Sequence, residues 1–571
     1  MKNILKKIFL SMVLVSMISC KNIEIKNIPA KSKIDNTVIK NLPAKPKVDN
    51  TVIKNLPAKP KTDNTVIKNP SVKSKTDNTV IKNPSVKPKT DNTVIKNPSV
   101  KPKTDNTVIK KLPVKSKVDL SVETFLDIPE IKNASLGIKV VNLKTDKTLF
   151  KFNPNKSLVP ASNMKLLTAG AALEILGKDY RFKTTLAYDG EVDSEGILNG
   201  NIYIIGGGDP TLGSRYLVAK HPIWITTEEK KRQIEFLNIW AEKVKTMGIK
   251  KINGNIITDP SYYPTGTLSK TWEWGDLRYT FASKPSGLTF LDNSIKLTFS
   301  KDEKDIKTSI SPTYTNTVVT NKIVVDGKGS SQITLVVPPY SNEIIALGTM
   351  NKPKISYNTV MQDPGSALGK VFSQTLEGKG IKNNGTISID KVDRKINKKI
   401  FIYNHYSPKL EEIISYMNKY SINLFAEHLK IEMEKDSSQT IKKYWSKHLS
   451  TQGLHIYDGS GLSRYNGVTP NTIVEVFKYM KKSKNFSSFY NSLAEPGKYG
   501  TFEDFQEKTV LIDNFHGKSG TLTGIKSYGG YINNIDGDLL AFSIIVNHHG
   551  LSNSKISKEL EKIIENIYYL K

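Results

Sequence analysis

Apolar and polar residues first alternate regularly near residue 136, where two short segments of this kind follow each other. Residues 136–142 and 148–152 have the two-residue period of half-buried strands, and the residues 144–146 near the junction are polar. This pattern predicts an antiparallel hairpin. The period then becomes helical over residues 160–176, which begin with Pro160, a residue favoured in the first turn of a helix. We therefore expect a helix after the hairpin.

The rest of the chain divides into a strand-rich middle, residues 181–400, and a mixed end. In the middle, strands are expected at 201–205, 251–257 and 333–338, where Gly, Pro and Asn separate alternating segments. After residue 405 the predicted helices cover 410–419, 423–433, 471–482 and 554–569, and the predicted strands cover 511–515, 517–522, 527–532 and 539–546. The pattern indicates an α+β fold that contains a β-rich stretch.

The residues before 119 have a different pattern. The hexapeptide Asp-Asn-Thr-Val-Ile-Lys recurs every 14 residues, starting at Asp35, Asp49, Asp63, Asp77, Asp91 and Asp105. Each repeat has two or three consecutive apolar residues beside a proline and several lysines, too little apolar surface to offset the entropy of ordering the chain. We expect residues 21–118 to be a disordered, extended spacer. A β-solenoid is the alternative, although the repeats lack a regular in-out alternation.

Residues 1–20 combine a basic start, an apolar stretch over 8–18 and the only cysteine of the chain, Cys20. The apolar stretch is too short for a membrane-spanning helix and is typical of a secretory signal peptide. A cysteine directly after it resembles a bacterial lipoprotein cleavage site, which implies a lipid anchor on Cys20 in a bacterial membrane. The alternative is an ordinary signal peptide with an incidental cysteine. Because Cys20 is the only cysteine and its thiol would be acylated, disulfides and cysteine catalysis are excluded.

The formal net charge of +30 belongs mostly to this N-terminal segment. Residues 21–118 hold 23 Lys against 7 acidic residues. A basic tail can bind nucleic acid, anionic lipid or an acidic wall polymer. Because the sequence contains no nucleic-acid-binding motif, we expect no nucleic-acid partner, and lipid or wall polymer is favoured.

The first candidate site is formed by Ser162 and Lys165, which lie three residues apart in the predicted helix and so project from one face. A serine is a weak nucleophile until a neighbouring base takes its proton. A lysine can be that base when burial or a nearby charge lowers the pKa of its amine. The S-x-x-K spacing also fits a helix cap beside a surface lysine, so it needs further support.

Two later motifs give that support. Ser421 and Asn423 lie at the junction of two predicted helices, where a hydroxyl and an amide can point into a cleft. Lys518, Ser519 and Gly520 lie on a predicted strand, and glycine permits the close approach of another backbone. The motifs S-x-x-K, S-x-N and K-S-G in this order resemble the active-site set of penicillin-binding proteins and serine β-lactamases.

Further stretches narrow the resemblance to the penicillin-binding protein 4-like D-alanyl-D-alanine carboxypeptidases, peptidase family S13. These stretches are residues 206–212 (GGGDPTL), 407–408, 417–419, 423–427, 458–464 (DGSGLSR) and 518–524 (KSGTLTG). The resemblance covers about residues 120–571. It implies a transpeptidase-like or β-lactamase-like domain of the α+β class, formed by 119–190 and 396–571 and split by an inserted β-rich module at 191–395.

The resemblance also implies roles for the motif residues. Ser162 attacks the carbonyl between two D-alanines, and Lys165 accepts its proton. Ser421 relays a proton to the leaving D-alanine, and Asn423 binds the substrate amide. Lys518 supplies positive potential that lowers the pKa of Lys165.

The third motif is expected to bind the terminal carboxylate of the substrate through the hydroxyls of Ser519 and Thr521, beside Gly520. The backbone N–H groups of Ser162 and Thr521 are expected to form the oxyanion hole. The inserted module contributes a W-x-W-x-D stretch that ends at Asp276, which the resemblance places near the amine of a diamino-acid side chain. The alternative is a surface loop with two packing tryptophans.

The expected activity is a penicillin-sensitive, serine-type D-Ala-D-Ala carboxypeptidase that acts on peptidoglycan stem peptides at the cell envelope, with β-lactams as inhibitors. The same acyl-enzyme also permits D,D-endopeptidase cleavage. No metal site or cofactor is predicted, because the histidines show no zinc-type spacing and no dinucleotide fingerprint is present. A serine β-lactamase and a non-catalytic, lysine-rich wall-binding lipoprotein are the alternatives.

Overall fold

A computed structural model describes residues 115–571 apart from 223–224, 265, 304, 327–328, 394–398, 436–439, 499 and 506–508. The expected signal peptide, Cys20 and nearly all of the expected spacer lie outside the described residues. Among the helices that the structure describes, none has the length and apolar character that crossing a membrane requires.

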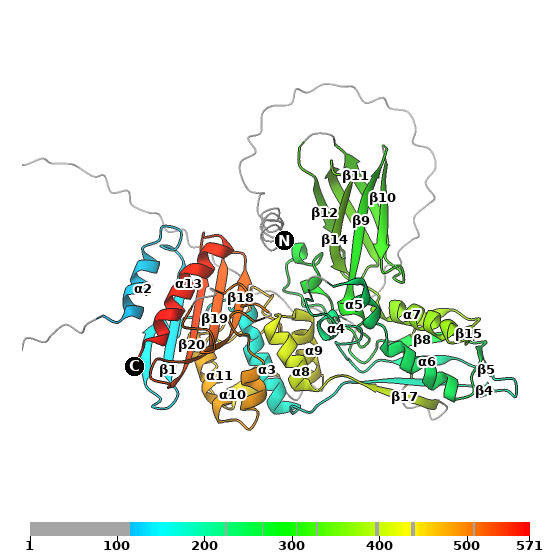
Figure 1. The fold of residues 1–571 in the computed structure, drawn as a ribbon, viewed down its shortest axis with the longest axis horizontal. Helices are drawn as coiled ribbons and strands as arrows, with labels where there is room; N and C mark the ends of the chain where they lie inside the picture. The colour runs from blue at the N-terminus through cyan, green and yellow to red at the C-terminus, as the bar shows by residue number, and fades with distance from the viewer. Residues whose placement is uncertain are drawn as a thin grey trace, which may run out of the picture. The chain divides into compact units, whose positions relative to one another are not determined.

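A five-stranded sheet in the order β18-β19-β20-β1-β2 brings the two ends of the described chain together (Figure 1). Strand β1 runs antiparallel to β20, from Ser135 opposite Asn547 to Asn142 opposite Leu540. The strands are β1 (Ser135–Asn142), β2 (Thr148–Phe152), β18 (Phe515–Leu522), β19 (Ile525–Asn533) and β20 (Leu539–Asn547). The predicted hairpin and the three strands predicted between 517 and 546 are therefore confirmed.

Both faces of this sheet are covered by helices, which explains why β20 is mostly apolar and is buried on both sides. Ile544 packs in one core with α2 (Lys117–Leu126) and α13 (Asn553–Tyr568), whereas its neighbour Ile545 packs in another core with α11 (Pro470–Lys482). Successive side chains of a strand point to opposite faces, so one strand serves both cores. Helix α2 begins two residues before the expected domain start at 119.

The second core is a cluster of helices around α3 (Met164–Ile175), in which every residue from Met164 to Leu173 is buried. Its neighbours leave little free space, since a Cβ on Gly170 would lie 2.8 Å from the Trp445 ring. The other helices are α8 (Leu410–Lys419), α9 (Asn423–Glu434), α10 (Ile441–Ser446), α11 and α12 (Phe486–Asn491). The helices predicted at 160–176, 410–419, 423–433, 471–482 and 554–569 are confirmed, the first with a 3-10 turn at its start.

A second five-stranded sheet, in the order β16-β8-β6-β3-β17, marks the inserted module. The chain enters it through β3 (Lys183–Tyr188) and leaves it through β17 (Ile400–Tyr406), which pair antiparallel with Lys183 opposite Tyr406. The remaining strands are β6 (Ile202–Ile205), β8 (Ile256–Asp259) and β16 (Ile387–Ile389), and a small neighbouring sheet holds β4 (Glu191–Val192), β5 (Ile197–Asn199), β7 (Lys251–Ile252) and β15 (Lys382–Asn383).

Two three-stranded sheets complete the module. One has the order β10-β9-β14 and the other β11-β13-β12, in which β11 and β13 run parallel. Their bounds are β9 (Ser294–Asp302), β10 (Asp305–Ser311), β11 (Val318–Val325), β12 (Gln332–Val336), β13 (Glu343–Met350) and β14 (Lys354–Val360).

The module also contains two long helices that the sequence analysis did not predict, α6 (Phe236–Thr246) and α7 (Pro364–Gly378). They pack against each other through Trp240 and Phe372, whose ring centroids lie 5.8 Å apart. Short helical segments precede α6 at α4 (Arg215–Val218) and α5 (Thr227–Arg232). The signal for α6 was present, because its buried residues Leu237, Trp240, Ala241 and Val244 have helical spacing.

Two strand predictions were wrong in part. The strand predicted at 251–257 is two strands, β7 and β8, separated at Gly254, where a Cβ would lie 2.2 Å from the Gly200 carbonyl oxygen. The segment 511–515 is a turn in which the N–H of Phe515 donates to the Leu511 carbonyl, and only Phe515 belongs to a strand. Asp513 has a φ of 62° there, which extended strands do not accommodate.

Candidate active site

Ser162 lies in a 3-10 turn, η1 (Ala161–Asn163), directly before α3. Ala161 has a φ of 48°, an unfavourable conformation for a residue with a side chain. A Cβ on Gly461 would come within 1.8 Å of the Ala161 carbonyl oxygen, so the backbone of Gly461 lies directly against this turn. The tight packing fixes a strained turn that presents the half-buried Ser162 at the start of a buried helix.

Lys165 follows one turn later, and its side chain is completely buried. Its Nζ lies 3.0 Å from Ser162 Oγ, 2.6 Å from Asn423 Oδ1 and 2.7 Å from the Ser460 carbonyl oxygen. Burial lowers the pKa of the Lys165 amine to about 7, although the charges of Asp458 and Glu427 raise it. The amine beside the Ser162 hydroxyl is therefore neutral in a large part of the molecules at neutral pH.

The second motif lies between α8 and α9. Ser421 has a φ of 59°, the second strained residue of the site, and its Oγ accepts a hydrogen bond of 2.9 Å from Lys518 Nζ. Asn423 begins α9, and its Nδ2 donates to the carbonyl oxygen of Phe281 in the inserted module at 2.9 Å. Because its Oδ1 faces Lys165, Asn423 contacts both parts of the fold.

Lys518 lies on β18, and its side chain is also completely buried. Burial lowers the pKa of Lys518 well below its usual value, and the charges of Lys165 and Lys526 lower it further. The family resemblance implied that the positive potential of Lys518 lowers the pKa of Lys165. In the structure, burial of Lys165 itself is the first cause of its low pKa, and the mutual repulsion of the two buried lysines acts in the same direction.

The rest of the third motif lies against the Ser162 turn. A Cβ on Gly520 would lie 2.7 Å from the Pro160 carbonyl oxygen and 2.9 Å from the Ser162 nitrogen, so only glycine fits there. Ser519 is 8% exposed, whereas Thr521 is exposed and its Oγ1 accepts from Lys526 Nζ at 3.0 Å. The structure thus brings Ser162, Lys165, Ser421, Asn423 and the third motif together.

Asp276 lies in a 3-10 turn, η2 (Trp274–Asp276), of the inserted module and is half-buried. Burial raises the pKa of the Asp276 carboxyl, and the charge of Glu273 raises it further. The two tryptophans of this stretch differ. Trp272 is buried and donates to Asp458 Oδ2 at 2.8 Å, whereas Trp274 is 75% exposed. Among the residues that the structure describes, no hydrogen bond or ion pair joins Asp276 to the motif residues.

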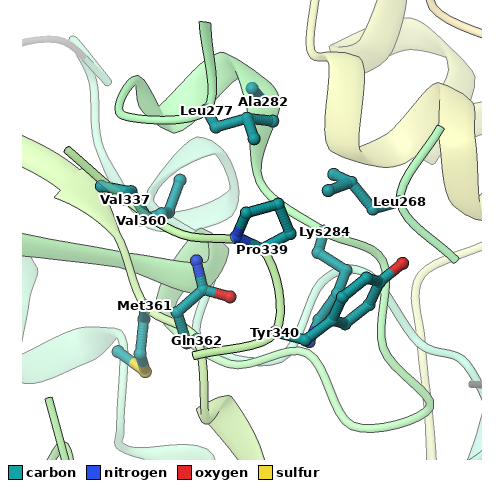
Figure 2. A pocket seen from close by; sticks show the side chains of 10 residues that line it. All are labelled: Leu268, Leu277, Ala282, Lys284, Val337, Pro339, Tyr340, Val360, Met361 and Gln362. Carbon is teal, nitrogen blue, oxygen red and sulfur yellow. The ribbon is translucent and has the colours of Figure 1, made fainter. Parts of the chain in front are cut away.

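Behind this loop the module is closely packed. Figure 2 shows the side chains of Leu277 and Ala282 facing those of Val337, Pro339 and Tyr340 around a cavity. The volume of this cavity is about 10 Å³, no larger than one water. The cavity is too small for a peptide. Trp272 of the W-x-W-x-D stretch contacts Asp458, and Phe281, which follows the stretch, contacts Asn423.

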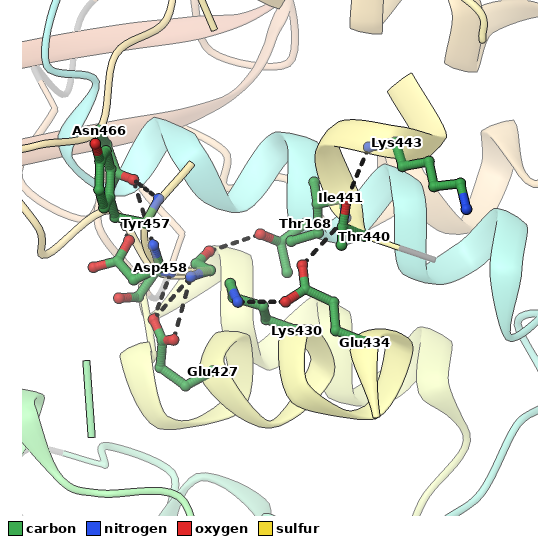
Figure 3. A network of polar contacts seen from close by, with 12 residues as sticks. Thr168, Glu427, Lys430, Glu434, Thr440, Ile441, Lys443, Tyr457, Asp458 and Asn466 are labelled. Atoms are coloured by element: carbon green, nitrogen blue, oxygen red, sulfur yellow. Dashed lines mark hydrogen bonds and ion pairs between the residues drawn. The ribbon is translucent and has the colours of Figure 1, made fainter. Parts of the chain in front are cut away.

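Two buried carboxylates, Glu427 and Asp458, had no role in the predicted site. They bind backbone N–H groups of residues 459–461, beside Lys165 (Figure 3). Glu427 Oε1 accepts from the N–H of Ser460 at 2.8 Å, and the carbonyl of the same residue accepts from Lys165. Asp458 Oδ1 accepts from the N–H of Gly461 at 2.8 Å. Burial and the charge of Asp458 raise the pKa of Glu427 to about 7.

A sequence signal for Glu427 existed, since it lies four residues after Asn423 and therefore on the same face of α9. Its partner Asp458 belongs to the DGSGLSR stretch, for which no role was assigned. The described residues contain no group of histidine, cysteine or carboxylate side chains that is arranged to hold a metal ion.

Comparison with known proteins identifies the family. The model of the D-Ala-D-Ala carboxypeptidase 3 (S13) family matches residues 118–567. The chain belongs to this family. A D-alanyl-D-alanine carboxypeptidase from an Actinomadura species is 27% identical over 462 residues, which cover 75% of this chain and 80% of the relative. The carboxypeptidase DacB of Haemophilus influenzae is 25% identical, over 74% of this chain and 86% of its own length.

A solved structure agrees with the fold. The crystal structure of penicillin-binding protein 4 from Haemophilus influenzae superimposes with a TM-score of 0.66 and 22% sequence identity, over 78% of this chain and 98% of that one. The same protein complexed with a β-lactam gives a TM-score of 0.61 at 21% identity, over 80% of this chain and 99% of that one. The predicted α+β fold of this S13 enzyme is confirmed.

Membership of the S13 family makes the protein a serine-type carboxypeptidase, a hydrolase, as the three motifs predicted. A β-lactamase and a non-catalytic wall-binding protein are not favoured. The family match covers the motif residues and both ends of the inserted module, but it does not assign a role to any single side chain.

Proposed function

We propose that this S13 carboxypeptidase hydrolyses the bond between the two terminal D-alanines of peptidoglycan stem peptides, with Ser162 as nucleophile. The observation that carries the proposal is the position of Lys165, a buried amine 3.0 Å from Ser162 Oγ with a pKa lowered to about 7. An amine of that pKa can accept a proton near neutral pH, which an ordinary surface lysine cannot do.

In the proposed acylation step, Lys165 takes the proton of Ser162 as its Oγ attacks the carbonyl carbon. The negative charge that develops on the carbonyl oxygen is stabilised by the backbone N–H groups of Ser162 and Thr521. The close packing of Gly520 against the Ser162 nitrogen supports this assignment, because it places the two backbone segments side by side.

The leaving D-alanine needs a proton on its nitrogen. Ser421 is the proposed donor, since its hydroxyl accepts from Lys518 Nζ and so keeps its own proton free for the leaving amine. Asn423 orients Lys165 and binds the substrate amide. Water then hydrolyses the acyl-enzyme and releases Ser162.

Recognition of the substrate is assigned to the third motif and to the inserted module. The hydroxyls of Ser519 and Thr521 are proposed to bind the terminal carboxylate. Asp276 is proposed to bind the amine of the diamino-acid side chain; the contacts of Trp272 with Asp458 and of Phe281 with Asn423 support this, because they join its loop to the site.

A peptide whose D-alanine is linked to a diamino acid forms the same acyl-enzyme, so D,D-endopeptidase cleavage belongs to the proposal. β-Lactams are the proposed inhibitors, supported by the β-lactam complex of the Haemophilus influenzae relative. The substrate is wall material, so the enzyme acts in the cell envelope. A lipid on Cys20 is the proposed membrane anchor, and residues 21–118 are the proposed spacer.

The test is labelling with a fluorescent penicillin followed by intact-mass measurement, with wild type compared to Ser162→Ala. A stable adduct in the wild type and none in the variant is expected. An adduct that clears within minutes indicates a β-lactamase instead. Absence of any adduct, together with binding to purified wall material that depends on residues 21–118, indicates a binding protein.

A further inference from the structure

Three buried lysines lie around the proposed site, and two of them have carboxylates nearby without forming a close ion pair. Lys165 and Lys518 are completely buried and Lys526 is 8% exposed. Within the part of the chain that the structure describes, none of the three forms a salt bridge. Burying a cation without a paired anion is unfavourable, so such groups tend to mark sites that bind an anion or move a proton. Lys165 and Lys518 have proposed roles, whereas Lys526 has none.

Lys526 lies on β19 directly opposite Thr521 of β18. Its Nζ donates a hydrogen bond of 3.0 Å to Thr521 Oγ1 and lies 5.1 Å from the centre of the Tyr528 ring. A hydroxyl that accepts from an ammonium group uses a lone pair and keeps its proton for another acceptor. The contact therefore leaves the proton of the exposed Thr521 hydroxyl free for another acceptor.

We infer that Lys526 is a positioning and specificity-determining residue for the terminal carboxylate of the substrate. It orients the Thr521 hydroxyl as a donor and supplies a positive charge close to the carboxylate. This inference rests on the proposed function, in which Thr521 binds that carboxylate. It adds a residue outside the three motifs and explains why a lysine is buried on the neighbouring strand.

The groups that face Lys526 come from several elements. Glu561 on α13 attracts its charge, and Tyr528 on β19 lies beneath it. The charge of Lys526 in turn lowers the pKa values of Lys518 on β18 and of His549, which follows β20. Burial lowers the pKa of Lys526 to about 8, so its charge is present below pH 8 and is lost above it. Binding of the substrate's terminal carboxylate should therefore weaken as the pH rises above 8.

The experiment compares two peptides that end in D-Ala-D-Ala, one with a free carboxylate and one with a C-terminal carboxamide. Steady-state hydrolysis is measured for wild type, Lys526→Met, Lys526→Arg and the control Lys562→Met, a surface lysine of α13 whose side chain is 59% exposed. Lys526→Met should lower kcat/KM about 10- to 100-fold for the carboxylate peptide, mainly through KM, and change the carboxamide peptide much less. Lys526→Arg should recover most of the loss, and Lys562→Met should resemble wild type.

A second readout uses the wild type alone, so it does not depend on whether a variant folds. KM for the carboxylate peptide should rise above pH 8, and KM for the carboxamide peptide should not. Equal losses for both peptides in Lys526→Met, or a KM that is independent of pH for both, would overturn the inference. Absence of hydrolysis and of a penicillin adduct in the wild type would overturn the proposed function itself, and this inference with it.

Discussion

Lys518 on β18 donates a hydrogen bond of 2.9 Å to Ser421, a residue 97 positions earlier in the chain. The contact joins β18, the edge strand of the sheet β18-β19-β20-β1-β2, to the turn before α9. Lys165 makes the corresponding contact from α3, reaching Asn423 over 258 positions. Two buried amines thus hold the second motif from two sides, and the proposed proton transfers depend on both.

The acylation rate at each pH should be proportional to the fraction of Lys165 amines that is neutral at that pH. Its pKa is lowered to about 7, so below pH 7 the amine is protonated and cannot accept the Ser162 proton. The rate of acylation by benzylpenicillin should fall about tenfold for each pH unit below 7 and level off above it. Stopped-flow measurement between pH 5 and 8 checks this. A rate that does not vary across that range would exclude Lys165 as the base.

Neutralising Glu427 should move that profile. The charge of Glu427 raises the pKa of Lys165, so Glu427→Gln should shift the acidic limb of the profile to lower pH. Because the pKa of Glu427 is itself about 7, its charge is present mainly above pH 7, so the acylation rate should rise most near pH 7, by up to about twofold, and little at pH 6. Glu434→Gln, on the same helix but paired with Lys430, is the control and should leave the profile in place. An unchanged limb in Glu427→Gln contradicts the electrostatic link.

Lys518 and Ser421 should act as a unit. Lys518→Met removes the donor that orients the Ser421 hydroxyl, and Ser421→Ala removes the hydroxyl itself, so each should lower kcat about 100-fold or more. Because both changes disable the same proton transfer, the double variant should be little worse than either single one. Peptide hydrolysis by the three variants measures this. Losses that multiply would mean that the two residues act separately.

The backbone of Gly461 should be essential for the Ser162 turn. Gly461 has a φ of 86°, and a Cβ would overlap the Ala161 carbonyl oxygen at 1.8 Å. Gly461→Ala should destabilise the fold by at least about 3 kcal/mol and abolish penicillin labelling. Gly378→Ala is the matched control, because a Cβ there meets nothing within 4 Å and should be neutral or stabilising by up to about 1 kcal/mol. Thermal unfolding with penicillin labelling distinguishes the two.

Asp276 should discriminate among stem peptides by their side-chain charge. Asp276→Asn should raise KM about tenfold for a peptide with a free amine on its diamino acid and leave a norleucine analogue unchanged. Asp193→Asn, in an exposed turn of the module, is the control. Equal changes for both peptides would assign Asp276 to the structure of its loop instead.

Much of the site could be predicted from the sequence because its chemistry is carried by short motifs. Ser162 lies in the 3-10 turn before α3 and Lys165 in the first turn of α3, and the helical spacing of three residues places their side chains together. The second and third motifs were recognised by residue type and order. Elements with a clear local pattern, such as the periodic helix α8 and the mostly apolar α3 and β20, were predicted for the same reason, whereas α6 was overlooked although its spacing was regular.

The relationships between distant segments were decided only by the tertiary structure. Burial, which sets the pKa of Lys165, depends on α9, the Asp458 loop and the sheet packing around α3 at once, and no local pattern reports it. The placement of Glu427 beneath Ser460 and of Lys526 beside Thr521 likewise requires a helix contact and a strand register. Local periodicity determines which face of its own helix or strand a side chain lies on. The residues that it contacts on that face depend on the packing of segments hundreds of residues apart.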